Sequence, residues 1–119
     1  MNDICSTDDV KTFVNAFYEK VRLDDMLAPV FDLRIKPEQW PQHLEKMYSF
    51  WNLMLFNDNT YKGMPYDKHA DLPVNKLHYE RWIMLFHSTI DENFAGTKAD
   101  EAKARGAMMA HIFSAKATG

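Results

Sequence analysis

The sequence predicts an all-α protein, and three observations support this fold class. Apolar residues recur at intervals of three and four along several long segments, which is the spacing of one helix face. No segment shows the strict alternation of apolar and polar residues that marks a half-buried strand. Every proline lies between the periodic segments or in the first turn of one.

Length, charge and cysteine usage narrow the class of protein. With 119 residues we expect one domain, residues 1–119, that buries a core without disulfides. A net charge of −3 provides no basic excess for nucleic acid. The single cysteine, Cys5, excludes a disulfide within the chain. Neither a signal peptide nor an apolar span long enough for a bilayer is found, so we expect a soluble cytoplasmic protein with no membrane partner.

The first helix is predicted from its cap and its apolar face. Ser6 or Thr7 serves as the N-cap, acidic residues follow in the first turn, and the helix runs to about Met26. Its apolar face comprises Val10, Phe13, Val14, Phe17, Tyr18 and Val21. Pro29 ends this region, and "APVFDLRIKP" predicts short turns with Phe31 as an apolar anchor.

Three further helices are predicted in the same way. The second begins near Pro37 or Pro41. The third begins between Pro73 and Asn75 and ends before Gly96, after which Thr97 and Asp100 resemble a capping box for the last helix. The predicted inward residues are Leu44, Met47, Tyr48, Phe50, Trp51, Met54 and Leu55 in the second helix, Tyr79, Trp82, Ile83, Phe86 and Ile90 in the third, and Met108, Met109, Ile112 and Phe113 in the last.

The stretch "TYKGMPYDKHADLP", residues 60–73, interrupts the helical pattern. A loop this long in a small helical domain is uncommon and is usually functional or disordered. Its aromatic and apolar residues prefer burial, which favours an ordered loop that helps to enclose a flat apolar ligand. His69 lies at its centre, although a lone loop histidine is more often solvated than ligating.

Three polar aromatic side chains lie on or beside apolar helix faces: Tyr18, His43 and Trp82. Each requires a hydrogen-bond partner when buried. Two interpretations follow from this pattern. These groups satisfy one another within a core, or they surround a small polar ligand.

Several separated stretches carry a family resemblance: "FYEKVRLDDMLAPVF", "WPQHLEKMYSFW", "YKGMPYDKHADLP" and "ERWIMLFH". In this order they resemble the group III truncated haemoglobins, from about residue 13 to residue 116. The absence of Gly-Gly pairs also fits that group. The resemblance implies a two-over-two helical sandwich around haem b, in which the proximal helix is reduced to a turn that presents His69.

The resemblance also implies roles for single residues. His69 would be the iron ligand, Tyr18 and Trp82 would donate hydrogen bonds to the bound ligand, and His43 would lie over the haem edge. His43 would either gate ligand entry or compete for the sixth position. The implied haem contacts are Phe31, Met47 and Phe50 as apolar walls and Tyr61, Lys62 and Lys68 near the propionates. Without the resemblance, the aromatic residues are ordinary core residues and the lysines are solvated.

The implied function is the binding of oxygen, nitric oxide, carbon monoxide or peroxide at a pentacoordinate iron. Two donors predict slow oxygen release, which favours nitric oxide dioxygenase or peroxidase-like chemistry with a separate electron-donating reductase. A non-catalytic oxygen-binding or gas-sensing protein is the alternative. A helical interaction module without haem is a third interpretation.

Overall fold

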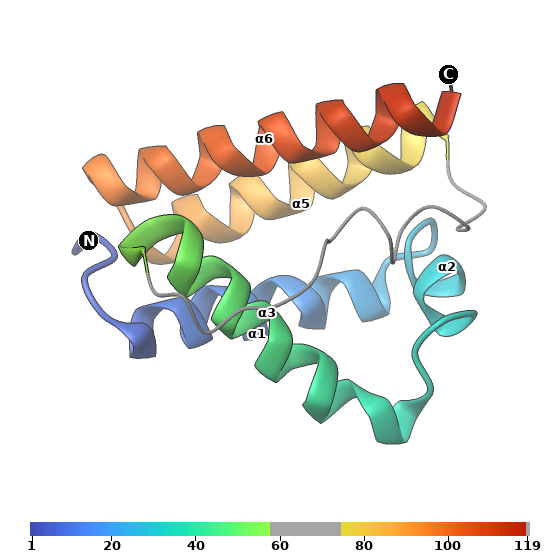
Figure 1. Ribbon diagram of the computed structural model, residues 1–119, viewed down its shortest axis with the longest axis horizontal. Helices are drawn as coiled ribbons and strands as arrows, with labels where there is room; N and C mark the ends of the chain where they lie inside the picture. Colours follow the sequence, from blue (N-terminus) through green and yellow to red (C-terminus); the bar gives the residue numbers. More distant parts are fainter. Residues whose placement is uncertain (58–74, 119) are drawn as a thin grey trace.

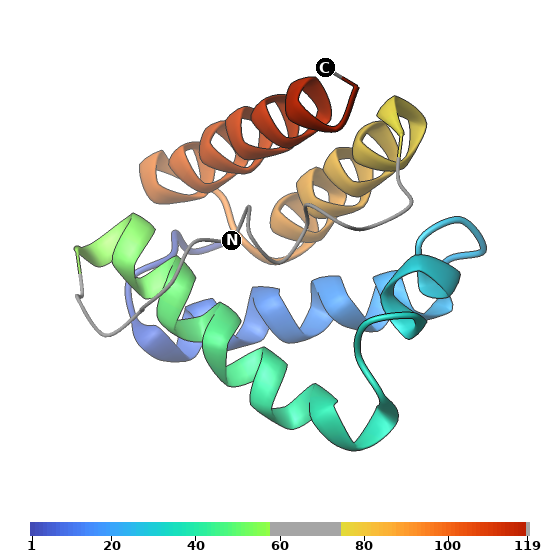
Figure 2. The same cartoon turned by 45° about the vertical axis from the view of Figure 1, so that its right-hand side comes forward.

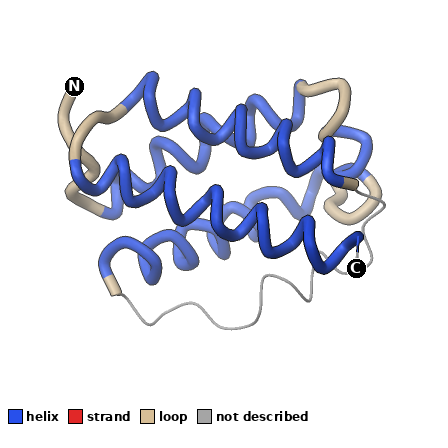
Figure 3. Tube along the Cα trace, turned by 90° about the horizontal axis from the view of Figure 1, so that it is seen from above, coloured by secondary structure: helices blue, strands red, loops and turns tan. Residues whose placement is uncertain are grey.

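The computed structural model describes residues 1–57 and 75–118, with side chains described up to residue 112. The described residues form five α-helices and one short 3-10 helix and no strand, which confirms the all-α prediction (Figure 3). These are α1 (Thr7–Leu23), α2 (Ala28–Asp32), η1 (Pro37–Gln39), α3 (Trp40–Phe56), α5 (Lys76–Asn93) and α6 (Thr97–Thr118).

The long helices form two layers of two helices each (Figures 1 and 2). Helices α1 and α3 pack together in one layer, and α5 and α6 pack together in the other. Helix α1 also packs against α5, and this contact joins the layers. The arrangement confirms the predicted two-over-two sandwich. Within the described residues, no helix is both long and apolar enough to cross a membrane.

Helix α1 begins as predicted and ends earlier than predicted. The Ser6 side chain accepts a hydrogen bond from the Asp9 amide at 3.3 Å, so Ser6 is the N-cap. The helix ends at Leu23 rather than near Met26, because Asp24 leaves the helical conformation and its carboxylate accepts the amides of Met26 and Leu27.

Pro29 does not end α1 but lies in the first turn of α2, a position that suits its fixed φ and missing N–H. The predicted turns at residues 28–36 therefore contain a short helix. It buries Phe31 at 9% exposure, which confirms the prediction of an apolar anchor there.

The starts of the second and third predicted helices are confirmed. Pro37 opens η1, and Pro41 lies in the first turn of α3. The Asn75 side chain accepts the amides of Leu77 and His78 and so caps α5. Of the predicted inward residues, Phe50, Trp51, Leu55, Tyr79, Phe86 and Ile90 are buried, while Leu44, Met47, Tyr48, Met54, Trp82 and Ile83 are half-buried.

The predicted inner face of α6 is wrong. Met108 is 63% exposed and Ile112 is 43% exposed, while Met109 is half-buried and the Phe113 side chain lies outside the described side chains. Small residues take the buried positions instead: Ala99, Ala102, Gly106 and Ala110. The reason is close helix packing, since a Cβ added at Gly106 would lie 2.7 Å from a Phe86 ring carbon. Larger side chains would push α6 away from α5.

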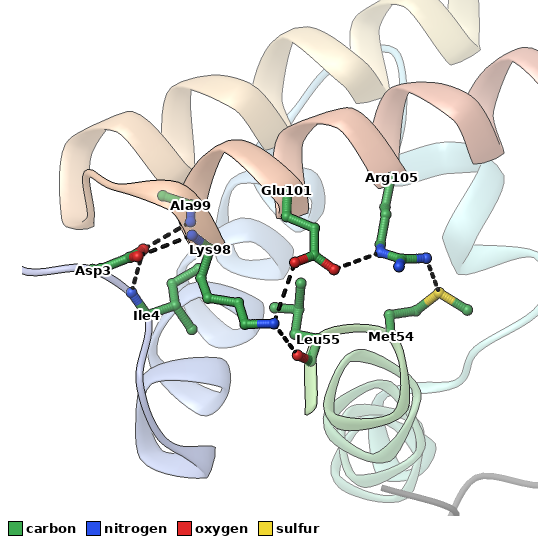
Figure 4. A network of polar contacts seen from close by, with 8 residues as sticks. All are labelled: Asp3, Ile4, Met54, Leu55, Lys98, Ala99, Glu101 and Arg105. Atoms are coloured by element: carbon green, nitrogen blue, oxygen red, sulfur yellow. Dashed lines mark hydrogen bonds and ion pairs between the residues drawn. The ribbon is translucent and has the colours of Figure 1, made fainter. Parts of the chain in front are cut away.

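The predicted cap of α6 is also wrong. Thr97 is the first helical residue rather than the N-cap, and the Asp3 carboxylate caps the helix from the start of the chain (Figure 4). Its two oxygens accept the amides of Lys98 at 2.9 Å and Ala99 at 2.8 Å. These bonds, with that from Lys98 the strongest, lower the pKa of Asp3.

Candidate functional site

The centre of the molecule is a continuous cluster of aromatic rings from α1, α3 and α5. Phe86 of α5 stacks with Trp51 of α3 at a centroid distance of 5.0 Å and with Trp82 of its own helix at 5.2 Å. Phe13 and Phe17 of α1 meet Phe86 edge-on, at 5.9 and 5.2 Å. Two predicted site residues, Tyr18 and Trp82, contact rings of this cluster.

Tyr18 lies beside this cluster and is 7% exposed. Its ring meets His43 of α3 edge-on at 5.3 Å and Phe31 of α2 at 6.1 Å. Trp40, at the start of α3, contacts the rings of both Tyr18 and His43, at 5.7 and 5.4 Å. The fold thus brings together three predicted site residues from three helices.

Trp40 is a site neighbour that the sequence analysis missed. Its signal was present, because a tryptophan three residues before His43 lies close to the same helix face. Its position next to Pro41 marks the start of a helix, and the predicted inner face of that helix begins only at Leu44.

Trp82 contacts Phe17, which also contacts Tyr18. Its ring meets Phe17 edge-on at 5.1 Å, and Phe17 meets Tyr18 at 5.0 Å. Trp82 is half-buried, whereas Phe17 is 2% exposed. The two predicted hydrogen-bond donors are therefore held in a fixed relation through one buried phenylalanine.

The face of α3 that follows His43 is apolar. Met47 and Phe50 come four and seven residues after His43, so all three side chains project from one side of the helix. Met47 is half-buried against the core, and Phe50 is buried at 5% exposure. The positions suit the predicted apolar walls.

An ion pair with a buried carboxylate is made by Arg81, the residue that directly precedes Trp82, and the sequence analysis missed it. The Asp24 side chain is 4% exposed. Its Oδ1 accepts a hydrogen bond from Arg81 Nε at 2.7 Å and lies 2.7 Å from Nη2 in the ion pair. Burial raises the pKa of Asp24, but the hydrogen bonds from Arg81, Leu27 and Met26 outweigh it and leave that pKa lowered. "LDD" at a helix end marks a turn, yet nothing in it indicates a partner 57 residues away.

Four predicted site residues lie outside the described residues: Tyr61, Lys62, Lys68 and His69. They belong to the segment between Asn57, the C-cap of α3, and Asn75, the N-cap of α5. Their predicted roles remain predictions.

The described residues fit a flat, largely apolar cofactor with a polar ligand on one side. Helices α3 and α5 diverge toward their N-terminal ends (Figures 1 and 2). The half-buried apolar side chains that these two helices pack against the core include Leu44, Met47, Trp82 and Leu85. Cofactor sites are typically apolar with a few placed polar groups, and Tyr18, His43 and Trp82 supply such groups here.

A separate cleft of about 760 Å³ lies between the end of α3 and the start of α6. Its charged groups already have partners (Figure 4). Lys98 donates to the Leu55 carbonyl at 2.5 Å and to Glu101 at 3.2 Å, and Glu101 accepts from Arg105 at 2.9 Å. This arrangement ties α3 to α6, and we interpret it as a helix junction.

Comparisons with known proteins agree with this geometry. Residues 2–116 match the family model described as bacterial-like globin. A group 3 truncated hemoglobin of Campylobacter jejuni is 36% identical over 85 residues, which are 69% of this chain and 67% of that protein. The crystal structure of group III truncated hemoglobin from Campylobacter jejuni matches with a TM-score of 0.88 and 30% identity, over 97% of this chain and 94% of that one.

Proposed function

Since the chain belongs to the bacterial-like globin family, and within it to the group III truncated haemoglobins, we propose that it binds haem b through His69. The family implies haem-based binding of gaseous ligands. The observation that carries the proposal is that Tyr18, His43 and Trp82, from three helices, are linked by ring contacts, Trp82 through Phe17 to Tyr18 and Tyr18 to His43. When bound, haem would supply an iron that can take oxygen, nitric oxide, carbon monoxide or peroxide as a ligand.

The residues around the cofactor divide into two sets. On the proximal side, His69 would use one neutral imidazole nitrogen for the iron, and Tyr61, Lys62 and Lys68 would face the propionates. On the distal side, Phe31, Met47 and Phe50 would exclude water and contact the ring. Met47 and Phe50 lie on the same face of α3 as His43, which supports this division.

Tyr18 and Trp82 would donate hydrogen bonds from the phenol O–H and the indole N–H. Donors to a group that carries negative charge are the stronger ones, and they are stronger still where water is excluded. Phe17 contacts both rings, so the donors need little reorganisation when the ligand arrives. We therefore expect slow oxygen release, which suits chemistry on the ligand better than oxygen transport.

The favoured reactions are the oxidation of nitric oxide and the activation of peroxide. In the activation of peroxide, His43 would hold or move a proton at an imidazole nitrogen, and the contact of its ring with Tyr18 supports this role. The electrons would come from a separate reductase. Storage of oxygen or sensing of a diatomic gas, without turnover, is the alternative. Multiple turnovers with an added reductase would favour the enzyme, and stoichiometric binding alone would favour the alternative.

The test is an absorption spectrum of the purified protein with haem: oxidised, reduced, and reduced with carbon monoxide. We expect an intense Soret band that shifts with carbon monoxide and that is weakened or altered in His69→Ala. His111→Ala is the matched control, because His111 is an exposed histidine of α6, and its spectra should equal those of the unaltered protein. An unaltered His69→Ala spectrum would remove His69 as the ligand. A protein without a Soret band would leave the helical interaction module as the better interpretation.

A further inference from the structure

We propose that Asp24 and Arg81 are positioning residues for the distal side, where their ion pair holds Trp82 in its place relative to Tyr18. The inference rests on the proposed function. Neither Asp24 nor Arg81 is among the residues proposed to contact the ligand. Arg81 directly precedes Trp82, one of the two proposed donors, in the sequence. The contacts of this pair carry the argument.

The Asp24 carboxylate accepts hydrogen bonds on both oxygens. Arg81 donates from Nε to Oδ1 at 2.7 Å, and its Nη2 lies 2.7 Å from the same oxygen in the ion pair. The amides of Met26 and Leu27 donate to Oδ2, each at 3.0 Å. A buried, charge-assisted group with this many donors has one favoured position, so Asp24 is a fixed point in the fold.

Three elements that carry distal residues meet at this point. Asp24 is the C-cap of α1, which carries Tyr18. Its backbone carbonyl accepts the Ala28 amide at 2.9 Å at the start of α2, which carries Phe31. The ion pair adds α5, on which Arg81 directly precedes Trp82.

The ion pair supplies a constraint that ring packing does not. Trp82 contacts the Phe17 and Phe86 rings, and these contacts hold the ring itself, whereas the ion pair holds the neighbouring residue of the same helix by a charge-assisted hydrogen bond. Successive residues of an α-helix project about 100° apart, since one turn holds about 3.6 residues. Fixing Arg81 against Asp24 therefore fixes the rotation of α5 about its axis, and with it the direction of the Trp82 indole.

A second ion pair between the same two helices offers a matched control. Lys20 of α1 donates to Glu92 of α5 at 2.7 Å. Glu92 lies ten residues after Trp82, about 15 Å along the helix at about 1.5 Å per residue. Lys20 is half-buried and Glu92 is exposed, so loss of this ion pair should leave the direction of the Trp82 indole unchanged.

The test compares Arg81→Met, Arg81→Lys and Lys20→Met in the haem-loaded protein, with carbon monoxide as the probe. The C–O stretching band in the infrared reports the hydrogen-bond donors near the ligand. We expect Arg81→Met to move or split the band and to speed oxygen dissociation about threefold to tenfold, in line with one weakened hydrogen bond. Arg81→Lys should restore the band in part, because the charge returns without the planar guanidinium that reaches Asp24 through Nε. Lys20→Met should leave band and rate unchanged.

An unchanged band in Arg81→Met, or an equal change in Lys20→Met, would overturn the inference. If Arg81→Met does not fold, as judged by circular dichroism, Asp24→Asn decides by the same criteria, because the amide keeps the volume and one acceptor oxygen. Failure of the proposed function is distinguishable: the unaltered protein would then show no Soret band and no haem–carbon monoxide band. A normal unaltered protein with insensitive variants would refute the positioning role alone.

Discussion

The imidazole of His43 stands edge-on to the phenol ring of Tyr18, with an interplanar angle of 85° and a centroid distance of 5.3 Å. Trp40 contacts both rings, so the three side chains form a closed group. Edge-to-face aromatic pairs contribute about 0.5–1.5 kcal/mol beyond their area burial. The Tyr18 ring is thus held by packing, and its hydroxyl group can be tested separately from its position.

Tyr18→Phe should therefore speed oxygen dissociation without disrupting the fold. Loss of one hydrogen bond to a charged group, about 1.5–3 kcal/mol, corresponds to a rate about tenfold or more faster. Displacement of oxygen by carbon monoxide in a stopped-flow instrument measures it. Tyr48→Phe is the control, since the Tyr48 hydroxyl donates to Asn15 on the α1–α3 interface. Equal rates in Tyr18→Phe and the unaltered protein would exclude the Tyr18 hydroxyl from ligand binding.

Trp82→Phe should act through the same ligand. Phenylalanine keeps an aromatic ring against Phe86 and Phe17 and removes only the indole N–H donor and the second ring. We expect faster oxygen dissociation, and we expect the double variant with Tyr18→Phe to differ from the sum of the two single effects, because both donors contact one ligand. Trp51→Phe should lower stability without changing the dissociation rate. Additive effects in the double variant would argue against a shared ligand.

Gly106→Ala should destabilise the protein. The added Cβ would lie 2.7 Å from a Phe86 ring carbon, and Phe86 is 1% exposed. Overpacking a core costs about 1–3 kcal/mol, and the better helix propensity of alanine recovers about 1 kcal/mol. We expect a net loss of up to about 2 kcal/mol in the free energy of unfolding, measured by urea denaturation. Ala104→Ser, on the exposed side of α6, adds one heavy atom and should change stability little. A more stable Gly106→Ala would contradict close α5–α6 packing.

Acid should remove the stability that Asp24 contributes. The pKa of Asp24 is lowered in the folded protein, so its contribution is fully present above the ordinary aspartate pKa of about 3.9 and is lost as the pH falls through the lower folded value. Because the Arg81 side chain is 42% exposed, we expect Asp24→Asn to cost only about 1–2 kcal/mol at neutral pH.

Urea denaturation at a series of pH values checks this prediction. The difference between Asp24→Asn and the unaltered protein should shrink below about pH 4. Asp25→Asn, at the exposed neighbouring residue, corrects for the general effect of removing one negative charge. A constant difference at all pH values would mean that the Asp24 charge does not contribute.

Local signals predicted much of the fold, and distant partners account for the errors. The caps at Ser6 and Asn75 and the prolines at the start of α3 act within one helical turn, so the sequence alone indicates them. The end of α1 was misplaced because the carboxylate that stops it, Asp24, is fixed partly by Arg81. Periodicity selects large apolar residues as the inner face of α6, but at Gly106 the Phe86 ring leaves no room for a larger side chain.

For the candidate site too, local signals were predictable from the sequence and contacts between distant residues were not. Tyr18, His43 and Trp82 were found because a polar aromatic residue near an apolar helix face needs a partner. That all three lie around Phe17 and Trp40 depends on how α1, α3 and α5 cross, and this is a property of the tertiary structure. The roles of the residues around His69 were inferred from the family resemblance and await the spectra.

The cap that Asp3 provides for α6 bears on the order of folding. Asp3 and Lys98 are 95 residues apart, so this contact closes most of the chain into a loop. The entropy of loop closure must be overcome before such a contact is gained, whereas the cap of α1 needs only neighbouring residues. We therefore expect substitution of Asp3 to speed unfolding and to leave the folding rate nearly unchanged, as for a contact formed after the transition state. The contact between Asp3 and the start of the last helix would then be lost before the transition state when the native protein unfolds.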